Sequence, residues 1–438
     1  MTNSIDEAAP PDVKRAQHTT SDIFNERESG VRSYCRSFPA TFSSAKGAYL
    51  TDADGHSYID FLAGAGALNY GHNHDIIKSA LVDYITHDGL THGLDMHTVA
   101  KQHFLETFDR LILRPRGLDY RVQFTGPTGT NSVEAALKIA RNVTGRSGIF
   151  SFMGGYHGDS LGSLSATANR AHRAAAGVPL HDVTFLPFPS GVMNEIDTLT
   201  YLRSILLDTH SGIELPAGLI VETIQAEGGI NVAPIAWLQE LRTICDDHGI
   251  ILIIDEIQTG CGRTGPFFSF ERAGIVPDIV TVSKSISGYG LPMSLTLLKP
   301  ELDTWQPGEH TGTFRGNQLA FVAATVAMEL FESEEISEQV AKHARTVESS
   351  LELLNAIDKR IEIRGVGMLW GVDTAAIDPN GELAREISQR CFSEGLIVER
   401  VGRNDTVLKV LPPLNIDEAT LAAGLAILTD ATRACLNR

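Results

Sequence analysis

Short apolar segments alternate with amphipathic stretches through the middle of this 438-residue chain, and no other feature constrains its fold as much. The apolar residues of these segments run on without polar alternation, which is typical of strands buried on both faces. The stretches between them have helical spacing. The chain therefore predicts an α/β fold with a mostly parallel central sheet sandwiched by helices. The predicted strands are residues 121–125, 148–152, 218–222, 250–255 and 279–283, and the predicted helices include 131–142 and 237–248.

The two ends of the chain follow a different pattern. Apolar runs on both sides of the Asp54-Gly55 pair predict a β-hairpin near the N-terminus. The last hundred or so residues predict two helices, a strand pair around 364–373 and 407–411, and a final helix. We expect the two ends to form a smaller α/β domain. The predicted division is a flexible leader at 1–20, the N-terminal part of the small domain at 21–75, a large domain at 76–320 and the C-terminal small domain at 321–438.

Charge and cysteine content argue against several classes of protein. A net charge of -18 disfavours binding to nucleic acid or to an anionic membrane. The five cysteines are odd in number and form no Cys-x-x-Cys pair, which argues against a disulfide framework and a zinc site. No secretory signal or membrane-length apolar run is visible, so we expect a cytoplasmic protein. His72, His74, His92 and His97 lack a carboxylate at helical ligand spacing, so no metal site is expected.

An acid and an amine follow two of the predicted strands. Asp255 ends the strand 250–255, and Lys284 comes directly after the strand 279–283. The carboxyl ends of parallel strands meet at one edge of a sheet, where ligands bind. A carboxylate and an amine held there suit pyridoxal phosphate, which lysine binds as a Schiff base while the acid pairs with the protonated pyridine nitrogen. Either residue alone is more often a helix cap or a solvated side chain.

A glycine- and threonine-rich turn provides the third part of the pattern. Residues 125–131 join a strand to a helix, so the amides of Gly129 and Thr130 are expected at a helix N-terminus. Free amides and the helix dipole favour an anion there. The alternative is an ordinary strand-to-helix turn with a threonine cap. A phosphate site, an acid for the ring nitrogen and a Schiff-base lysine together specify pyridoxal phosphate.

Two further motifs spell the signatures of other enzymes. Residues 260–265 read Gly-Cys-Gly-Arg-Thr-Gly, but a dinucleotide motif follows its strand at once and opens a helix. Here four residues intervene and Pro266 follows. Residues 158–162 read Gly-Asp-Ser-Leu-Gly, yet the preceding strand ends near Phe152, too early for the sharp turn of a hydrolase nucleophile. Neither a nucleotide-binding protein nor a hydrolase is expected.

The region around Asp255 resembles a known family. Asp255-Glu-Ile-Gln-Thr-Gly260 followed by Gly262-Arg-Thr-Gly265 is similar to the signature of the class III aminotransferases, which are fold-type I pyridoxal-phosphate enzymes, and Lys284 falls at the expected distance. The similarity extends from about Phe24 to near the C-terminus. Several stretches resemble the diaminobutyrate–2-oxoglutarate aminotransferases, the type that opens ectoine biosynthesis. They are residues 33–39, 68–73, 124–130, 283–294 and 312–317.

The resemblance assigns cofactor contacts residue by residue. Gly129 and Thr130 would hold the phosphate, and Gln258 would hydrogen-bond the hydroxyl side of the ring. Tyr156 would stack on the ring face, unless it is a core aromatic residue. Thr313 would reach the phosphate of the neighbouring subunit, which implies a homodimer or a dimer of dimers.

The substrate contacts depart from the pattern of many relatives. Glu227 resembles a gating glutamate that pairs with an arginine when the amine donor is bound and releases it for the keto acid. Here Lys409 stands where many relatives carry that arginine. A lysine is a point charge without a bidentate fork, so the switch is expected to be modified or served by another residue. Arg36 or Arg32 could bind a substrate carboxylate, although an exposed arginine is usually solvated.

The resemblance also implies a reaction. The terminal amine of L-2,4-diaminobutyrate would pass to 2-oxoglutarate in a ping-pong transamination, giving L-aspartate 4-semialdehyde and L-glutamate. Ornithine and 4-aminobutyrate stay open as donors because they differ by only a few atoms. A racemase or mutase on the same fold and a non-catalytic binding protein also stay open. The sequence does not decide whether the pathway leads to ectoine, a siderophore or an antibiotic.

Overall fold

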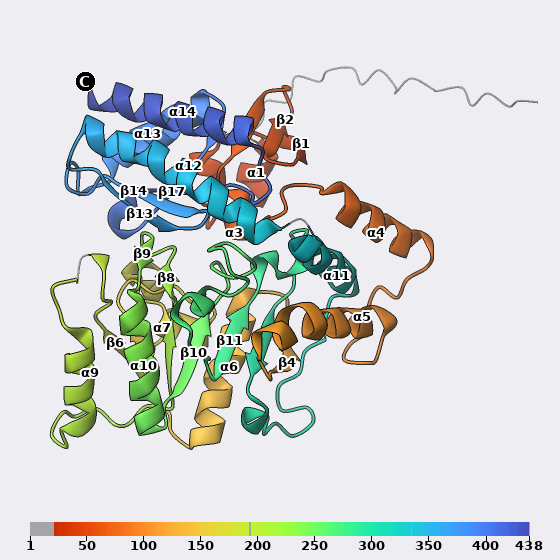
Figure 1. Ribbon diagram of the computed structural model, residues 1–438, viewed down its shortest axis with the longest axis vertical. Helices are drawn as coiled ribbons and strands as arrows, with labels where there is room; N and C mark the ends of the chain where they lie inside the picture. The colour runs from red at the N-terminus through yellow and green to blue at the C-terminus, as the bar shows by residue number, and fades with distance from the viewer. Residues whose placement is uncertain (1–21, 192–193, 334, 438) are drawn as a thin grey trace, which may run out of the picture.

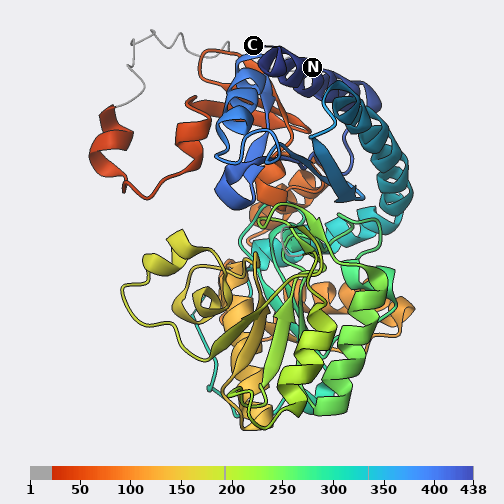
Figure 2. The ribbon, with the colours of Figure 1, turned by 90° about the vertical axis from the view of Figure 1, so that its left-hand side faces the viewer.

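The computed structural model describes residues 22–191, 194–333 and 335–437. The predicted leader, residues 1–20, lies outside the described residues. Figure 1 shows two bodies, a lower one built around a seven-stranded sheet and an upper one that joins the two ends of the chain. The same two bodies are distinct in Figure 2, which is turned by 90°.

The lower body is organised by a sheet in the order β4-β12-β11-β10-β7-β5-β6. β12 runs antiparallel to both neighbours, and the other neighbouring pairs are parallel. The predicted mostly parallel sheet is therefore confirmed, with β6 and β12 added to the five predicted strands. The strands are β4 Arg121–Phe124, β5 Ile149–Phe152, β6 Val183–Leu186, β7 Gly218–Val221, β10 Ile251–Asp255, β11 Ile279–Val282 and β12 Leu295–Leu298.

The continuous apolar runs of this sheet fill a separate core on each face. In β10, Ile253 packs with residues of α6, whereas Leu252 and Ile254 belong to the core that contains Trp237 and Leu241 of α10. Successive side chains of a strand point to opposite faces, so a strand covered on both sides needs apolar residues at every position. The helices of the lower body are α4 Asp75–Thr86, α5 Val99–Thr107, α6 Gly129–Thr144, α7 Leu161–Ala166, α8 Arg170–Ala174, α9 Thr198–Leu207, α10 Ile235–His248 and α11 Gln318–Ser333.

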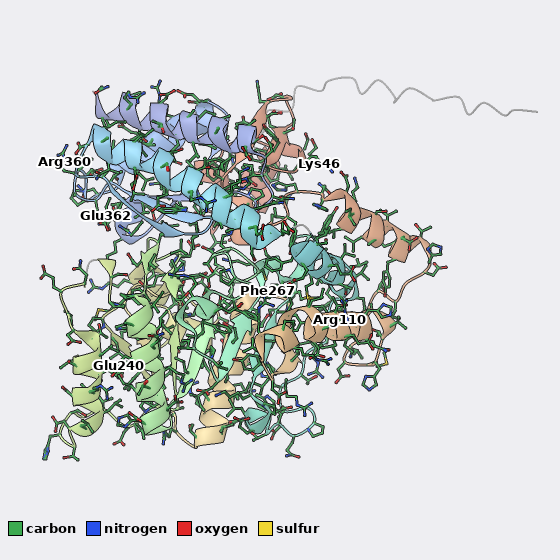
Figure 3. The ribbon with its side chains drawn as sticks, viewed as in Figure 1. Lys46, Arg110, Glu240, Phe267, Arg360 and Glu362 are labelled. Atoms are coloured by element: carbon green, nitrogen blue, oxygen red, sulfur yellow. The ribbon has the colours of Figure 1, made fainter. Side chains whose placement is uncertain are left out.

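Aromatic residues fill the middle of the molecule. Phe267, near the centre of Figure 3, is 2% exposed and its ring contacts those of Phe108, Phe268 and Phe331. Arg360, by contrast, lies at the edge of the same view. Short helical turns complete this part of the chain. They are a π-helical turn at Phe108–Leu113 and 3-10 turns at Arg114–Arg116, Ser269–Ala273, Lys284–Ser287 and Pro300–Leu302.

The upper body combines both ends of the chain in two four-stranded sheets. One has the order β1-β2-β3-β15, in which β15 from the C-terminal segment pairs in parallel with β3 of the predicted hairpin. The other is antiparallel, in the order β13-β14-β17-β16. The strands are β1 Phe42–Lys46, β2 Tyr49–Asp52, β3 Ser57–Asp60, β13 Glu362–Val366, β14 Leu369–Asp373, β15 Leu396–Ile397, β16 Glu399–Val401 and β17 Val407–Val410.

Helices cover these two sheets. α14 meets the length and composition criteria for a membrane span, but it packs against α12 and α13 and buries Leu421, Leu425 and Leu428. It is therefore a core helix of the upper body. The helical elements of the upper body are α1 Asp22–Arg27, α2 Tyr34–Ser37, α3 Ala63–Gly66, α12 Ile336–Ile357, α13 Glu382–Ser393, α14 Glu418–Leu436 and a 3-10 turn at Arg403–Asp405. The lower body also contains a small hairpin of β8 Ile224–Gln225 and β9 Asn231–Val232.

The predicted domain boundaries fall at two helices. The boundary after residue 75 coincides with the start of α4, and the boundary after residue 320 falls inside α11. α11 packs against α4 and α5 of the lower body. The division into domains stays a prediction.

Candidate active site

A cavity of about 360 Å³ lies at the carboxyl edge of the central sheet. The ends of β7, β10 and β11 contribute to its wall, together with the N-terminus of α6. Most of the residues predicted to bind the cofactor meet here. Its lining consists of Thr128, Gly129, Thr130, Tyr156, His157, Gly158, Asp159, Ser160, Glu222, Ala226, Glu227, Asp255, Ile257, Gln258, Thr259 and Lys284.

Lys284 follows β11 and lines the cavity. Its φ is 51°, in the left-handed region that a non-glycine residue seldom adopts. Such backbone strain is concentrated at functional sites. Burial lowers the pKa of the Lys284 amine; the charge of Glu227 opposes this effect and that of Lys409 adds to it. A larger fraction of Lys284 is therefore in the neutral amine form than of a surface lysine at the same pH.

Asp255 is held at the end of β10 by groups on both sides. Its Oδ2 lies 2.7 Å from Nδ1 of His157, and its Oδ1 accepts hydrogen bonds from the Thr281 hydroxyl at 3.0 Å and the Ile257 amide at 3.1 Å. Thr281 is also the neighbour of Asp255 in the register of β10 and β11. Burial alone would lower the pKa of His157, but the hydrogen bond to Asp255 and its charge raise it. His157 therefore donates to the Asp255 carboxylate.

The predicted anion site forms the N-terminal turn of α6. Gly129 and Thr130 are the first residues of this 16-residue helix, so their amides have no carbonyl in a preceding helical turn. The Thr130 hydroxyl lies 2.7 Å from that of Ser160. Gly158 packs against it, because a Cβ at Gly158 would come within 2.5 Å of Thr130 Oγ1. The turn thus presents amides and hydroxyls to one end of the cavity.

Tyr156 lines the cavity and is oriented through two acids. Its hydroxyl donates to Asp159 at 3.0 Å, and its amide donates to Glu222 at 3.0 Å. Burial raises the pKa of Tyr156, so the phenol stays protonated. The position agrees with the predicted aromatic contact on a ring, which stays a prediction.

Glu222 is a buried acid that the sequence pattern did not identify. It follows β7 and accepts hydrogen bonds from the amides of Tyr156 and Ala226, at 3.0 and 3.2 Å. Burial raises its pKa to about 7. His157 was also missed as a partner of Asp255, although it stands beside Tyr156 in the sequence. Glu222 could have been suspected because, like Asp255, it is an acid that ends a buried strand.

Gln258, Glu227 and Lys409 form a connected cluster beside the cavity. Lys409 Nζ lies 2.6 Å from Glu227 Oε1, and Gln258 Nε2 donates to the same oxygen at 3.0 Å and to the Ala65 carbonyl at 2.9 Å. Burial alone would raise the pKa of Glu227, but the charges of Lys409 and Lys284 hold it well below its ordinary value. Lys409 therefore does pair with Glu227, despite having no bidentate fork.

The same lysine has a second acid partner. Glu399 Oε2 lies 2.8 Å from Lys409 Nζ, and Glu399 Oε1 accepts a hydrogen bond from the Tyr34 hydroxyl at 2.8 Å. Neither Glu399 nor Tyr34 was among the site residues predicted from the sequence. The available signal was a glutamate placed inside the apolar run 396–401, where a buried charge needs a partner.

Three predicted side chains lie away from this cavity. Arg36 is exposed and donates to the Gly30 carbonyl, while Arg32 pairs with Glu28 at 3.3 Å. Thr313 is exposed and outside the lining. The structure thus does not bring Arg36 or Arg32 to the site, and it leaves Thr313 available to a neighbouring chain.

The two motifs of other enzymes have no matching geometry. The segment 260–265 forms turns after β10 and opens no helix. The Ser160 hydroxyl donates to Glu134 and has no histidine among its hydrogen-bond partners in the described chain. Among the described residues, no group of three or more histidine, cysteine, aspartate or glutamate side chains could hold a metal ion.

Comparisons with known proteins agree with this geometry. A family model described as "Aminotransferase class-III" matches residues 32–432. The protein named diaminobutyrate–2-oxoglutarate transaminase of Bordetella parapertussis is 52% identical over 93% of both chains. A protein of the same name from Halalkalibacterium halodurans is 51% identical over 95% of this chain and 97% of its own.

Solved structures have the same fold. Ornithine aminotransferase from Toxoplasma gondii superposes with a TM-score of 0.81 at 25% identity, covering 94% of each chain. An amine transaminase from an uncultivated Pseudomonas species, in its PLP-bound form, gives a TM-score of 0.82 at 26% identity and covers 94% of this chain and 98% of its own.

Proposed function

The chain belongs to the class III aminotransferases, and we propose that it transfers the terminal amine of L-2,4-diaminobutyrate to 2-oxoglutarate. The products are L-aspartate 4-semialdehyde and L-glutamate. The observation that carries this proposal is the identity of 51–52%, over nearly the whole chain, with relatives that bear this activity in their names. The cavity at the sheet edge supports it, because an amine, an acid and an anion site converge there.

The family implies pyridoxal phosphate, and the donor set of the cavity fits this cofactor. Lys284 supplies the amine for covalent attachment, Asp255 an ionised acceptor for the ring nitrogen, and Gly129 and Thr130 the N–H groups for the phosphate. Tyr156 offers an aromatic ring beside the same space. When bound, the cofactor supplies a carbonyl carbon for the amine and an electron-withdrawing ring.

Lys284 has two tasks in the proposed mechanism. Its amine would hold the cofactor, and the free amine would move a proton away from the amine-bearing carbon of the donor. Both tasks need the neutral amine. The lowered pKa of buried Lys284 increases that form near neutral pH.

Asp255 would hold a proton at the ring nitrogen of the bound cofactor. A pyridinium in a buried site needs an ionised acceptor, and the raised pKa of His157 keeps a donor on the far side of that carboxylate. The hydroxyl of Thr281 fixes its orientation. Asp255 and His157 thus act as one unit.

The charge of the cavity favours an amine donor. Asp159, Glu227 and Asp255 line it, and Lys284 is the only lysine or arginine among its described lining residues. We propose that Glu227 covers Lys409 while the donor is bound and withdraws when a keto acid brings a carboxylate. Gln258, which donates to Glu227, would follow this movement.

We propose that the enzyme is a homodimer, or a dimer of dimers, in the cytoplasm. Large apolar side chains are exposed over α4, the segment 90–99 and Phe314, and an apolar patch of this kind is typical of an interface. Phe314 follows Thr313, and its ring centroid lies 5.4 Å from that of His92. Thr313 therefore lies where it could reach a partner. The exposed apolar residues are Ile76, Val82, Ile85, Leu90, Leu94, Met96, Val99 and Phe314.

Ornithine is the second candidate donor, because the ornithine enzyme of Toxoplasma gondii has the same fold. The two donors differ by one methylene, which a pocket distinguishes by only ~1–3 kcal/mol. A panel of L-2,4-diaminobutyrate, ornithine and 4-aminobutyrate with 2-oxoglutarate separates them by glutamate formation. We expect kcat/KM for diaminobutyrate to exceed the others by about tenfold or more. Equal or better use of ornithine would refute the assignment, and Lys284→Ala provides the background rate.

A further inference from the structure

Glu399 and Lys409 face each other across neighbouring strands. They are direct partners in the register of β16 and β17, and the other neighbour of Lys409, on β14, is Gly371. A glycine offers no side chain, so within this sheet Glu399 is the acid directly opposite the lysine. Lys409 is 0% exposed and the Glu399 side chain is 10% exposed. The pair is therefore part of the strand pairing of the upper body.

The two acid partners of Lys409 differ in how they are held. Glu227 lies in the turn between β8 and β9, its side chain is 28% exposed, and it lines the cavity. Glu399 lies within a strand, outside the lining, and is fixed by the hydroxyl of Tyr34. Glu227 is the more exposed of the two acids and borders the cavity, whereas the Glu399 side chain is 10% exposed and is held by the Tyr34 hydroxyl as well as by Lys409.

A buried lysine depends on its partners in a way that an arginine does not. A guanidinium stays protonated in proteins, but an ammonium in an apolar site loses its proton when no counter-ion is near. The charged and polar groups around Lys409 are Glu227, Glu399, Gln258 and Lys284. Lys284 opposes a charge on Lys409, and Gln258 is neutral. Without Glu227, Glu399 is the one acid among these described groups that remains to stabilise the ammonium.

We propose that Glu399 is the permanent counter-ion of Lys409, which keeps this lysine charged and in place when Glu227 moves aside for a substrate carboxylate. Tyr34 orients Glu399 for this purpose. The inference rests on the proposed function, because it assumes that one site accepts an amine donor and then a keto acid. Glu399 is a positioning residue that acts through Lys409.

The test uses glutarate, an unreactive dicarboxylate, with the pyridoxal-phosphate holoenzyme. The dissociation constant of glutarate is measured by calorimetry from about pH 6.5 to about pH 9.5, a window that extends from neutral to alkaline pH. Glu399→Gln should weaken glutarate binding by about tenfold or more at the alkaline end and less at the acidic end. Without Glu399 the pKa of Lys409 falls, so more of the lysine loses its proton as pH rises. Glu362→Gln, an exposed acid on β13, is the matched control and should bind as wild type.

A rescue separates this role from a merely structural one. In the Glu399→Gln background, Lys409→Arg should restore glutarate affinity to within about threefold of Lys409→Arg alone and remove the alkaline loss, because arginine keeps its charge without Glu399. Wild-type binding in Glu399→Gln, or failure of the arginine to rescue, would overturn the proposal. Should Glu399→Gln not fold, Tyr34→Phe should give a smaller loss with the same pH trend, and no loss would contradict us. Since no amine donor is used, an incorrect donor assignment leaves this test unaffected.

Discussion

At the scale of single residues, the site depends on carboxylates that are held by different partners. Asp255 accepts hydrogen bonds from His157, Thr281 and Ile257, which hold its carboxylate in place for a cationic partner. Glu222, at the end of the neighbouring strand β7, has only two backbone amides as donors, and burial raises its pKa. Two buried acids of one cavity thus differ in the groups around them, which set how each acid titrates.

Asp255→Asn tests the role of Asp255 as the partner of the ring nitrogen. An amide leaves the ring cation without its counter-ion, and breaking a buried ion pair costs about 3–5 kcal/mol. Each 1.36 kcal/mol corresponds to a factor of ten in rate. If the loss falls on the transition state, we therefore expect kcat to fall by about a hundredfold or more. Steady-state glutamate formation measures it, with the exposed Asp303→Asn as control. A fall of less than about fivefold would remove Asp255 from this role.

Glu222→Gln tests the raised pKa of Glu222 through the pH dependence of protein stability. The pKa of Glu222 is raised from 4.5 to about 7 on folding, so the folded protein retains a proton that the unfolded chain loses between these values. The wild type therefore loses stability as pH rises from 4.5 to about 7, by about 3 kcal/mol. The glutamine variant lacks this loss. Relative to wild type, its free energy of unfolding should rise by about that amount between pH 4 and pH 8 in urea titrations. A pH-independent difference would contradict the raised pKa.

At the scale of elements, the cavity forms because several chain segments end or begin at one sheet edge. The carboxyl ends of β10 and β11 place Asp255 and Lys284, and the N-terminus of α6 places the anion site beside them. The segment that carries Tyr156 and His157 closes the other side and packs on α6 through Gly158. Function at this scale depends on close backbone approach as much as on side-chain chemistry.

Gly158→Ala tests this packing. The backbone there has φ +119°, and a Cβ would approach Thr130 Oγ1 to 2.5 Å. Strain of about 1–3 kcal/mol and a displaced Thr130 should weaken pyridoxal-phosphate binding by about tenfold and lower the melting temperature. Fluorescence titration of the apoenzyme measures the first effect. Gly177→Ala, also at positive φ but in open space, should bind the cofactor as wild type; an equal effect in both variants would exclude the proposed contact.

The sequence predicted the strand ends but not the pairing between distant strands. Asp255 and Lys284 could be placed because a buried strand is visible locally and its carboxyl end follows from the chain direction. Glu399 could not, because its contact with Lys409 depends on the register of β16 and β17. Arg36 lies away from the cavity in the described chain, and its role as a substrate contact stays a prediction, because no pattern fixes the direction of a side chain in a short helix. Thr313 stays a prediction, since its expected partner belongs to another chain.

At the scale of the whole molecule, the two ends of the chain cover a site that the middle builds. Lys409 and Glu399 come from the upper body, while Glu227 and Gln258 come from the lower one, and their hydrogen bonds and ion pairs join the two. Movement of Glu227 would therefore weaken a contact between the bodies. A second copy would add Thr313 to this arrangement.

Phe314→Glu tests the proposed dimer. A charge in place of an apolar side chain that is 71% exposed should weaken an interface there and shift the protein toward monomer in sedimentation velocity. Cofactor affinity should fall with it if Thr313 acts in the partner subunit. Leu353→Glu, on α12 and 58% exposed, should remain dimeric. A monomeric wild type, or an unchanged dimer in Phe314→Glu, would contradict the proposed interface.

The central claim is that Lys284 carries the cofactor. Borohydride reduction of the holoenzyme converts a lysine–cofactor linkage into a stable amine, and peptide mass mapping then locates the added pyridoxyl group. We expect modification of the peptide that contains Lys284, with loss of the visible absorbance band and no modification in Lys284→Ala. A pyridoxyl group on any other lysine, or an unmodified protein after reduction, would contradict it.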